Sequence, residues 1–145
     1  MAPKNKSCIL VTGGAGFIGS HLCKYLLKSG HKVVCVDNFN NFHDPLIKEK
    51  NISDLMERKD FRLFRADIRD KAGMEDIFRE ARPELVIHLA AMAGVRPSIA
   101  DPFLYYDVNV KGTLTLLETM RHSGVARMIF ASSSSVYGNN SKIPF

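Results

Sequence analysis

The stretch VTGGAGFIG, residues 11–19, constrains the fold of this chain more than any other part of the sequence. It joins a short apolar run, residues 8–12, to a segment at 17–29 whose apolar residues recur at helical spacing and which Gly30 ends. Glycine lowers the stability of regular structure and is favoured where another group approaches the backbone closely. We therefore predict a buried strand, a glycine-rich turn and an amphipathic helix, in that order.

The same alternation continues along the chain. Apolar runs predict strands at 32–37, 61–66, 85–89 and 127–132, and periodic segments predict helices at 46–57, 71–81 and 103–122. Nearly continuous apolar strands that alternate with helices indicate a parallel sheet covered on both faces. The prediction is one Rossmann-like domain over 1–145, an α/β fold with a doubly wound parallel sheet that ends after its fifth strand.

The glycines at 13, 16 and 19 have the spacing G-x-x-G-x-x-G at the predicted strand-to-helix turn. A turn without Cβ atoms lets a pyrophosphate contact the amides at a helix N-terminus, where the helix dipole favours anions. A P-loop is excluded, because Ser20 stands where its lysine is required. The alternative is a tight turn without a ligand.

Asp37 closes the second predicted strand, 18 residues after Gly19. An acid at this place accepts hydrogen bonds from the ribose hydroxyls of a bound dinucleotide. Its charge would repel a 2′-phosphate, and no arginine follows closely, so NAD is preferred to NADP. The alternative for Asp37 is a turn residue or a helix cap.

The composition narrows the classes of partner and of cellular location that fit this chain. The net charge is +5, but the cations are interspersed with acids, which favours a solvated basic surface over a nucleic-acid partner. The three cysteines are widely spaced and odd in number, as expected of reduced thiols in a cytoplasmic protein. No apolar run is long enough for a membrane span.

His88 lies within an apolar strand and is expected to be a hydrogen-bonded core residue, not a metal ligand. No metal site is predicted.

Six motifs in order resemble the extended short-chain dehydrogenase/reductases, specifically the NAD-dependent nucleotide-sugar epimerases and dehydratases. They are TGGAGFIG, VDNFN at 36–40, ADIRD at 66–70, VIHLAA at 86–91, VNVKGT at 108–113 and SSSSVYG at 132–138. The resemblance covers almost the whole chain. Within the family, AGVRPS at 93–98 looks most like UDP-glucuronate 4-epimerases.

The resemblance implies roles for individual residues. The expected NAD-binding set is Gly13, Gly16, Phe17, Ile18, Gly19, Asp37, Asn38, Asp67, Ile68, Leu89, Ala90, Ala91 and Asn109. Ser133 would be the catalytic hydroxyl, which steadies negative charge on the sugar oxygen or relays its proton. Its alternative is a hydroxyl that caps backbone groups. Arg96 and Ser134 are weaker candidates for substrate binding, Arg96 from a loop at a strand end.

The chemistry of the parent enzyme follows from what stands beside Ser133. The related dehydratases and decarboxylases carry carboxylates near the catalytic hydroxyl, whereas this chain has Ser134 and Ser135 there. A 4-epimerase acting on a UDP-sugar is therefore favoured over a dehydratase or decarboxylase. The family's Tyr-x-x-x-Lys is absent from these 145 residues. The chain is thus expected to be an N-terminal portion with little activity, or else a non-catalytic NAD-binding module.

The predicted helix at 103–122 has apolar residues on more than one side. A helix that covers a sheet needs one apolar stripe, so the excess indicates either a homodimer through this helix or deep burial within the chain.

Overall fold

The computed structural model describes residues 6–140, 142 and 144. Its centre is one five-stranded parallel sheet with the order β3-β2-β1-β4-β5. The strands are β1 (Cys8–Thr12), β2 (Lys32–Asp37), β3 (Phe61–Arg65), β4 (Leu85–His88) and β5 (Met128–Phe130). The chain moves outward from β1 to β3 and then returns to the other side of β1, so the order reverses between β1 and β4. The predicted doubly wound α/β fold is confirmed.

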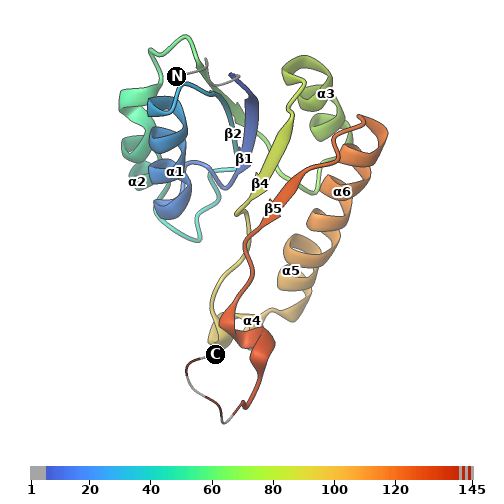
Figure 1. Cartoon of the computed structure of the whole chain (residues 1–145). Helices are drawn as coiled ribbons and strands as arrows, with labels where there is room; N and C mark the ends of the chain where they lie inside the picture. Colours follow the sequence, from blue (N-terminus) through green and yellow to red (C-terminus); the bar gives the residue numbers. More distant parts are fainter. Residues whose placement is uncertain (1–5, 141, 143, 145) are drawn as a thin grey trace.

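Helices cover both faces of the sheet (Figure 1). The bounds along the chain are α1 (Phe17–Lys28), α2 (Pro45–Ile52), the 3₁₀ turn η1 (Ser53–Leu55), α3 (Lys71–Ala81), α4 (Val95–Ala100), α5 (Pro102–Tyr106), the π-helical segment η2 (Asp107–Gly112), α6 (Thr113–His122) and the 3₁₀ turn η3 (Ser134–Tyr137). Helices α1 and α2 lie on one face, and α3 and α6 on the other.

Among the described residues, one large apolar core lies on each face of the sheet. Residues that alternate along β1 divide between them: Val11 packs with α1, whereas Leu10 packs with α3 and α6. Both side chains are fully buried. A strand buried on both faces reads as a continuous apolar run, which is why residues 8–12 could be recognised from the sequence.

Most predicted elements match the structure within a few residues. The predicted helix at 46–57 divides into α2 and η1, and the strand at 127–132 shortens to β5. The helix predicted at 103–122 is helical throughout, from α5 through η2 to α6, but its middle turn is a π-helix. Helix α4 was not predicted: residues 95–100 include Pro97 and lack a buried side chain, so no apolar stripe marks them.

Candidate functional site

A cavity of about 310 Å³ opens at the carboxyl ends of the strands, at the reversal of strand order. Ligands of open parallel sheets bind at this place. Twelve of the thirteen residues predicted to bind the cofactor line the cavity: Gly13, Gly16, Phe17, Ile18, Gly19, Asp37, Asn38, Asp67, Ile68, Leu89, Ala90 and Ala91. Segments from four strand ends therefore meet in one site.

The glycine turn fits closely against its neighbours. Gly13 has a φ of +67°, and a Cβ there would lie 2.9 Å from the amide nitrogen of Ala90. A Cβ on Gly19 would lie 2.7 Å from the Cα of Gly14. Both distances are shorter than real Cβ contacts, so these two positions require glycine.

Helix α1 presents a bare N-terminus to the cavity. Its N-cap is Gly16, with no side-chain cap hydrogen bond, and its first turn contains no acidic residue. Phe17 and Ile18 begin the helix and line the cavity. The first amides of a helix have no acceptor within the helix, so this end can bind an anion through main-chain N–H groups.

Asp37 lies at the end of β2 and is almost completely buried. One carboxylate oxygen accepts from the amide of Phe39 and from Nζ of Lys48, each at 2.9 Å; the other accepts from the amide of Ala15 at 3.2 Å. The bond to Phe39 is the turn arrangement considered in the sequence, but the bond to Ala15 also ties Asp37 to the glycine turn. Asp37 therefore lines the cavity and also stabilises the turn that follows β2.

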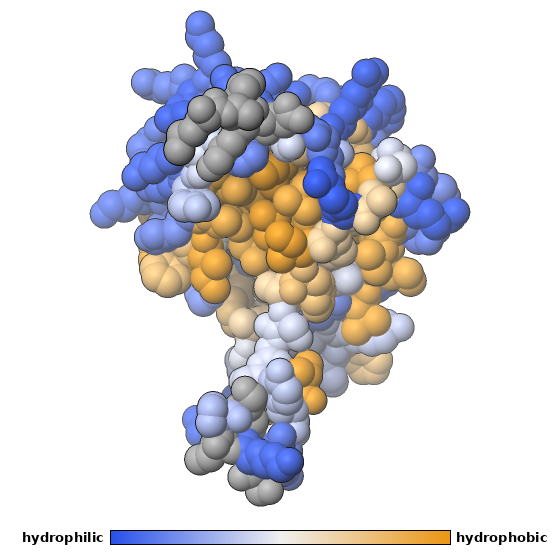
Figure 2. Space-filling model, in the orientation of Figure 1, coloured by the Kyte–Doolittle hydropathy of each residue, from blue (hydrophilic) through white to orange (hydrophobic). Residues whose placement is uncertain are grey.

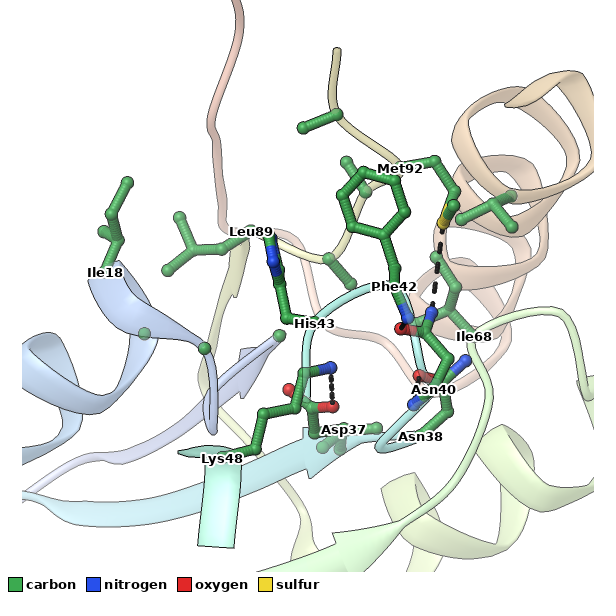
Figure 3. Close-up of a pocket in the computed structure, with 18 of the residues that line it drawn as sticks. Ile18, Asp37, Asn38, Asn40, Phe42, His43, Lys48, Ile68, Leu89 and Met92 are labelled. Atoms are coloured by element: carbon green, nitrogen blue, oxygen red, sulfur yellow. Dashed lines mark hydrogen bonds and ion pairs between the residues drawn. The ribbon is translucent and has the colours of Figure 1, made fainter. Parts of the chain in front are cut away.

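Lys48 is the main residue of the site that sequence reasoning missed. Helix α2 begins at an Asp44 cap followed by Pro45, and this start places Lys48 beside Asp37, with side chains 11% and 3% exposed. Figure 3 shows the pair at the base of the cavity. The Asp-Pro start of a helix was a usable signal, but eleven residues separate the partners, and only the packing of α2 brings them together.

The loop between β2 and α2 adds further lining residues. Asn38 and Asn40 each accept, through the side-chain oxygen, from the amide two residues on. Between them Phe39 adopts a φ of +51°, uncommon for a bulky residue. The loop brings Phe42 and His43 into the cavity, and Figure 3 shows His43 rising between Ile18 and Phe42. These two residues were not predicted.

Asp67 and Ile68 follow β3 and line the opposite wall. Asp67 accepts two side-chain hydrogen bonds from Arg69, at 2.8 and 2.9 Å, and one from Asn38 at 2.9 Å. The Arg69 guanidinium lowers the pKa of Asp67 to about 2, helped by the Arg69 amide and Asn38. Arg69 also bonds Asp107 at 3.0 Å, which connects this wall to η2.

Asn109 is the one predicted cofactor residue outside the lining. Its side chain accepts from the Met92 amide at 2.8 Å and donates to the Met92 carbonyl at 2.9 Å. It thus holds the segment that follows Leu89, Ala90 and Ala91. Met92 itself lines the cavity.

Ser133, Ser134 and Arg96 do not line the cavity. Ser133 accepts from the Ser135 amide and donates to the Ser135 hydroxyl, each at 3.2 Å, so it caps η3 as the alternative interpretation expects. Ser134 is exposed in η3. Arg96 was expected in a loop; it lies exposed in the first turn of α4.

His88 is buried at the end of β4 and bonds two threonine hydroxyls, which confirms the expected core position. Burial lowers its pKa to about 4. Within the described residues, no group of His, Cys, Asp or Glu side chains is arranged to hold a metal ion. Helices long and apolar enough to cross a bilayer are also absent from that part of the chain.

Fold, glycine turn and strand-end cavity together define a doubly wound, Rossmann-like α/β protein. The family model for GDP-mannose 4,6-dehydratase matches residues 10–145, so the chain belongs to that family. The predicted membership of the nucleotide-sugar epimerases and dehydratases is thereby confirmed.

Three of the similar proteins are nucleotide-sugar 4-epimerases. The chain is 44% identical to a UDP-glucose 4-epimerase of Klebsiella pneumoniae, covering 94% of this chain and 96% of that protein. It is 42% identical to a UDP-glucuronate 4-epimerase of Thermodesulfobacterium geofontis, covering 91% of this chain and 41% of the relative. The UDP-glucose 4-epimerase of Bifidobacterium longum, solved with NAD⁺ and UDP, superposes with a TM-score of 0.84 at 38% identity, over 96% of this chain and 41% of that one.

The fraction of each relative's length that this chain covers differs from one relative to another. The chain spans 41% to 43% of the length of several curated relatives, and nearly all of the Klebsiella protein.

Proposed function

We propose that this chain is the cofactor-binding portion of an NAD-dependent nucleotide-sugar 4-epimerase of the UDP-glucose or UDP-glucuronate type. The observation that carries the proposal is the single cavity in which a bare helix N-terminus, the glycine turn and Asp37 meet. The structure of the Bifidobacterium relative was solved in complex with NAD⁺ and UDP.

Different residues of the cavity are proposed to contact different parts of NAD. The amides of Phe17 and Ile18 would bind the pyrophosphate, Asp37 the adenosine ribose, and Asp67 with Ile68 the adenine. Leu89, Ala90 and Ala91 would line the path to the nicotinamide. NAD, once bound, supplies hydride transfer to and from the sugar C4, and this chain would hold it.

Catalysis by the chain alone is expected to be slight. Ser133 is its proposed catalytic hydroxyl, and Ser134 and Arg96 are proposed to reach the sugar, whereas the sequence carries no Tyr-x-x-x-Lys base. The test is an NAD titration joined with an epimerisation assay on UDP-glucose and UDP-glucuronate. Binding with slow epimerisation supports the proposal, binding with none supports a non-catalytic module, and elimination of water from a nucleotide sugar supports a dehydratase. No NAD binding would overturn the proposal.

We also propose a homodimer through the helix formed by α5, η2 and α6. Phe103, Tyr106, Val110, Leu114 and Leu117 recur at helical spacing and are 45% to 84% exposed. They form a second apolar stripe, opposite the one that packs on the sheet, and two copies of it would be self-complementary. Leu114→Glu would shift sedimentation toward monomer; an unchanged sedimentation coefficient would contradict the dimer.

A reducing, cytoplasmic location belongs to the same proposal. Cys8, Cys23 and Cys35 are all free thiols, and two are buried.

A further inference from the structure

The hydrogen bonds around His88 determine where its proton lies. His88 Nδ1 lies 2.6 Å from the Thr12 hydroxyl oxygen, and Nε2 lies 3.0 Å from that of Thr113. A neutral imidazole has one donor and one acceptor nitrogen, and distances alone do not say which is which. The partners of the two hydroxyls decide it.

Thr12 fixes one side of the ring. Its hydroxyl oxygen accepts from the amides of Leu89 and Ala90, each at 3.2 Å. Amides only donate, so this oxygen is the acceptor in both contacts, and the Leu89 amide is shared between it and the Thr12 main-chain carbonyl, also at 3.2 Å. The third contact, to His88 Nδ1, must use the hydroxyl proton, and Nδ1 is therefore the acceptor.

Thr113 fixes the other side independently. Its hydroxyl lies 2.7 Å from the main-chain carbonyl of Asn109, one turn earlier. A carbonyl only accepts, so the Thr113 proton points to Asn109, and His88 Nε2 must carry the proton that Thr113 accepts. Both sides require the same neutral ring, protonated on Nε2.

The resulting network has one direction throughout. The Leu89 and Ala90 amides donate to Thr12, Thr12 donates to His88, His88 donates to Thr113, and Thr113 donates to the carbonyl of Asn109. The Asn109 side chain then bonds the amide and carbonyl of Met92. The cavity floor at 89–92 is thus held from β1 at one end and from η2 at the other.

We propose that His88, as the neutral Nε2–H tautomer, is a positioning residue that sets the cofactor-facing backbone of residues 89–92. The inference rests on the proposed NAD site for its functional part. A displaced Ala90 amide would alter its contact with Gly13, where no atom can be added, so the network also controls the spacing of the glycine turn. A buried polar network with every member satisfied is rigid, which suits a cofactor floor.

Other charged groups around the cavity do not replace this role. The carboxylate of Asp37 is paired with Lys48, and that of Asp67 with Arg69. The ring of His88 itself packs against Phe130 of the neighbouring strand, with the two ring centroids 5.6 Å apart. Burial lowers the pKa of His88 to about 4, so the ring is neutral at physiological pH.

The tautomer can be read directly by NMR of the 15N-histidine-labelled 145-residue chain. At pH 7 the signals that disappear in His88→Phe should show a protonated Nε2 and an unprotonated Nδ1. A protonated Nδ1, or a charged ring, would overturn the assignment. This measurement does not depend on NAD, so it stands even if the proposed function fails.

The positioning role is tested at Thr113 with a matched pair. Thr113→Val removes the hydroxyl, whereas Thr113→Ser keeps it. Valine removes the acceptor of His88 Nε2–H and the donor to the Asn109 carbonyl, so it should shift the amide signals of Ala90 and Met92 and weaken NAD binding about tenfold, and serine should restore both. Unmoved amide signals with unchanged NAD affinity in Thr113→Val, or a serine variant no better than valine, would overturn the role. If the wild-type chain does not bind NAD, the proposed function fails, and the amide signals alone decide the positioning role.

Discussion

The carboxyl ends of β1 to β3 and the carboxyl end of β5 differ sharply in how they are held. At the first region, Asp37 and Asp67 are fixed by bonds from other elements, including α2 and the glycine turn. At the second, Ser133 bonds Ser135, two residues away, and η3 has no buried residue. Long-range bonds pre-organise a binding site, whereas bonds within one turn fix only that turn. The ends of β1 to β3, where we propose that the cofactor binds, are therefore pre-organised, whereas Ser133 lies outside the cavity lining.

The surface shows the same contrast. β5 is one of the two outer strands of the sheet, and its Ile129 and Phe130 are each 55% exposed. Figure 2 shows a broad apolar area over the β4 and β5 side of the molecule. An unpaired apolar strand edge favours association with another strand, so this chain is expected to self-associate at high concentration.

The largest effect is expected from the buried pair of Asp37 and Lys48 at the end of β2. Lys48→Met would leave the Asp37 carboxylate buried without its cation, and should lower the free energy of unfolding by about 3 kcal/mol in urea denaturation. The double variant Asp37→Asn/Lys48→Met removes both charges and should lose less. A single variant as stable as wild type would show that the pair does not hold this region.

The next effect tests the glycine turn. Gly19→Ala would force a Cβ against Gly14, lowering stability by about 1–3 kcal/mol and weakening NAD binding about tenfold or more by calorimetry. Gly124→Ala is the matched control: its φ is +71°, but no atom lies within 4 Å of a Cβ there. It should cost about 1 kcal/mol from backbone strain and leave NAD affinity unchanged. Equal NAD affinity in both variants would remove the turn from the site.

A smaller effect depends on pH. The pKa of Asp67 is lowered to about 2 in the folded chain, from about 3.9 in an unfolded one, so its stabilisation is complete above about pH 4 and is lost as the pH falls toward 2. Arg69→Met should remove most of that stabilisation. The difference in unfolding free energy between wild type and variant should thus shrink from pH 6 to pH 3. A difference that is constant over this range would contradict the pairing.

The smallest effect is expected at the serine end. Ser133→Ala removes a cap on an exposed turn and should change stability by no more than about 0.5 kcal/mol and NAD affinity by less than about twofold. A tenfold loss of NAD affinity in this variant would place Ser133 at the cofactor and reverse the contrast between the two regions.

The sequence by itself determined most of the architecture. The strands at residues 8–12 and 32–37 could be predicted because each is buried on both faces of the sheet. A strand of this kind is a nearly continuous apolar run, which is visible in the sequence without knowledge of its neighbours. The glycines at 13 and 19 are equally readable, since no other residue fits a turn this close. The resemblance to the nucleotide-sugar epimerases and dehydratases implied thirteen cofactor-binding residues, and twelve of them line the cavity.

Only the tertiary structure decided the partners. Lys48 reaches Asp37 because α2 packs beside β2, and His88 acquires its single tautomer because β1 and α6 place two threonines on opposite sides of one ring. Helix α4 carries no apolar stripe, and the π-helical turn of η2 leaves no mark in side-chain periodicity. Local patterns encode which element forms, whereas the pairing of polar groups across elements depends on positions that many distant contacts set together.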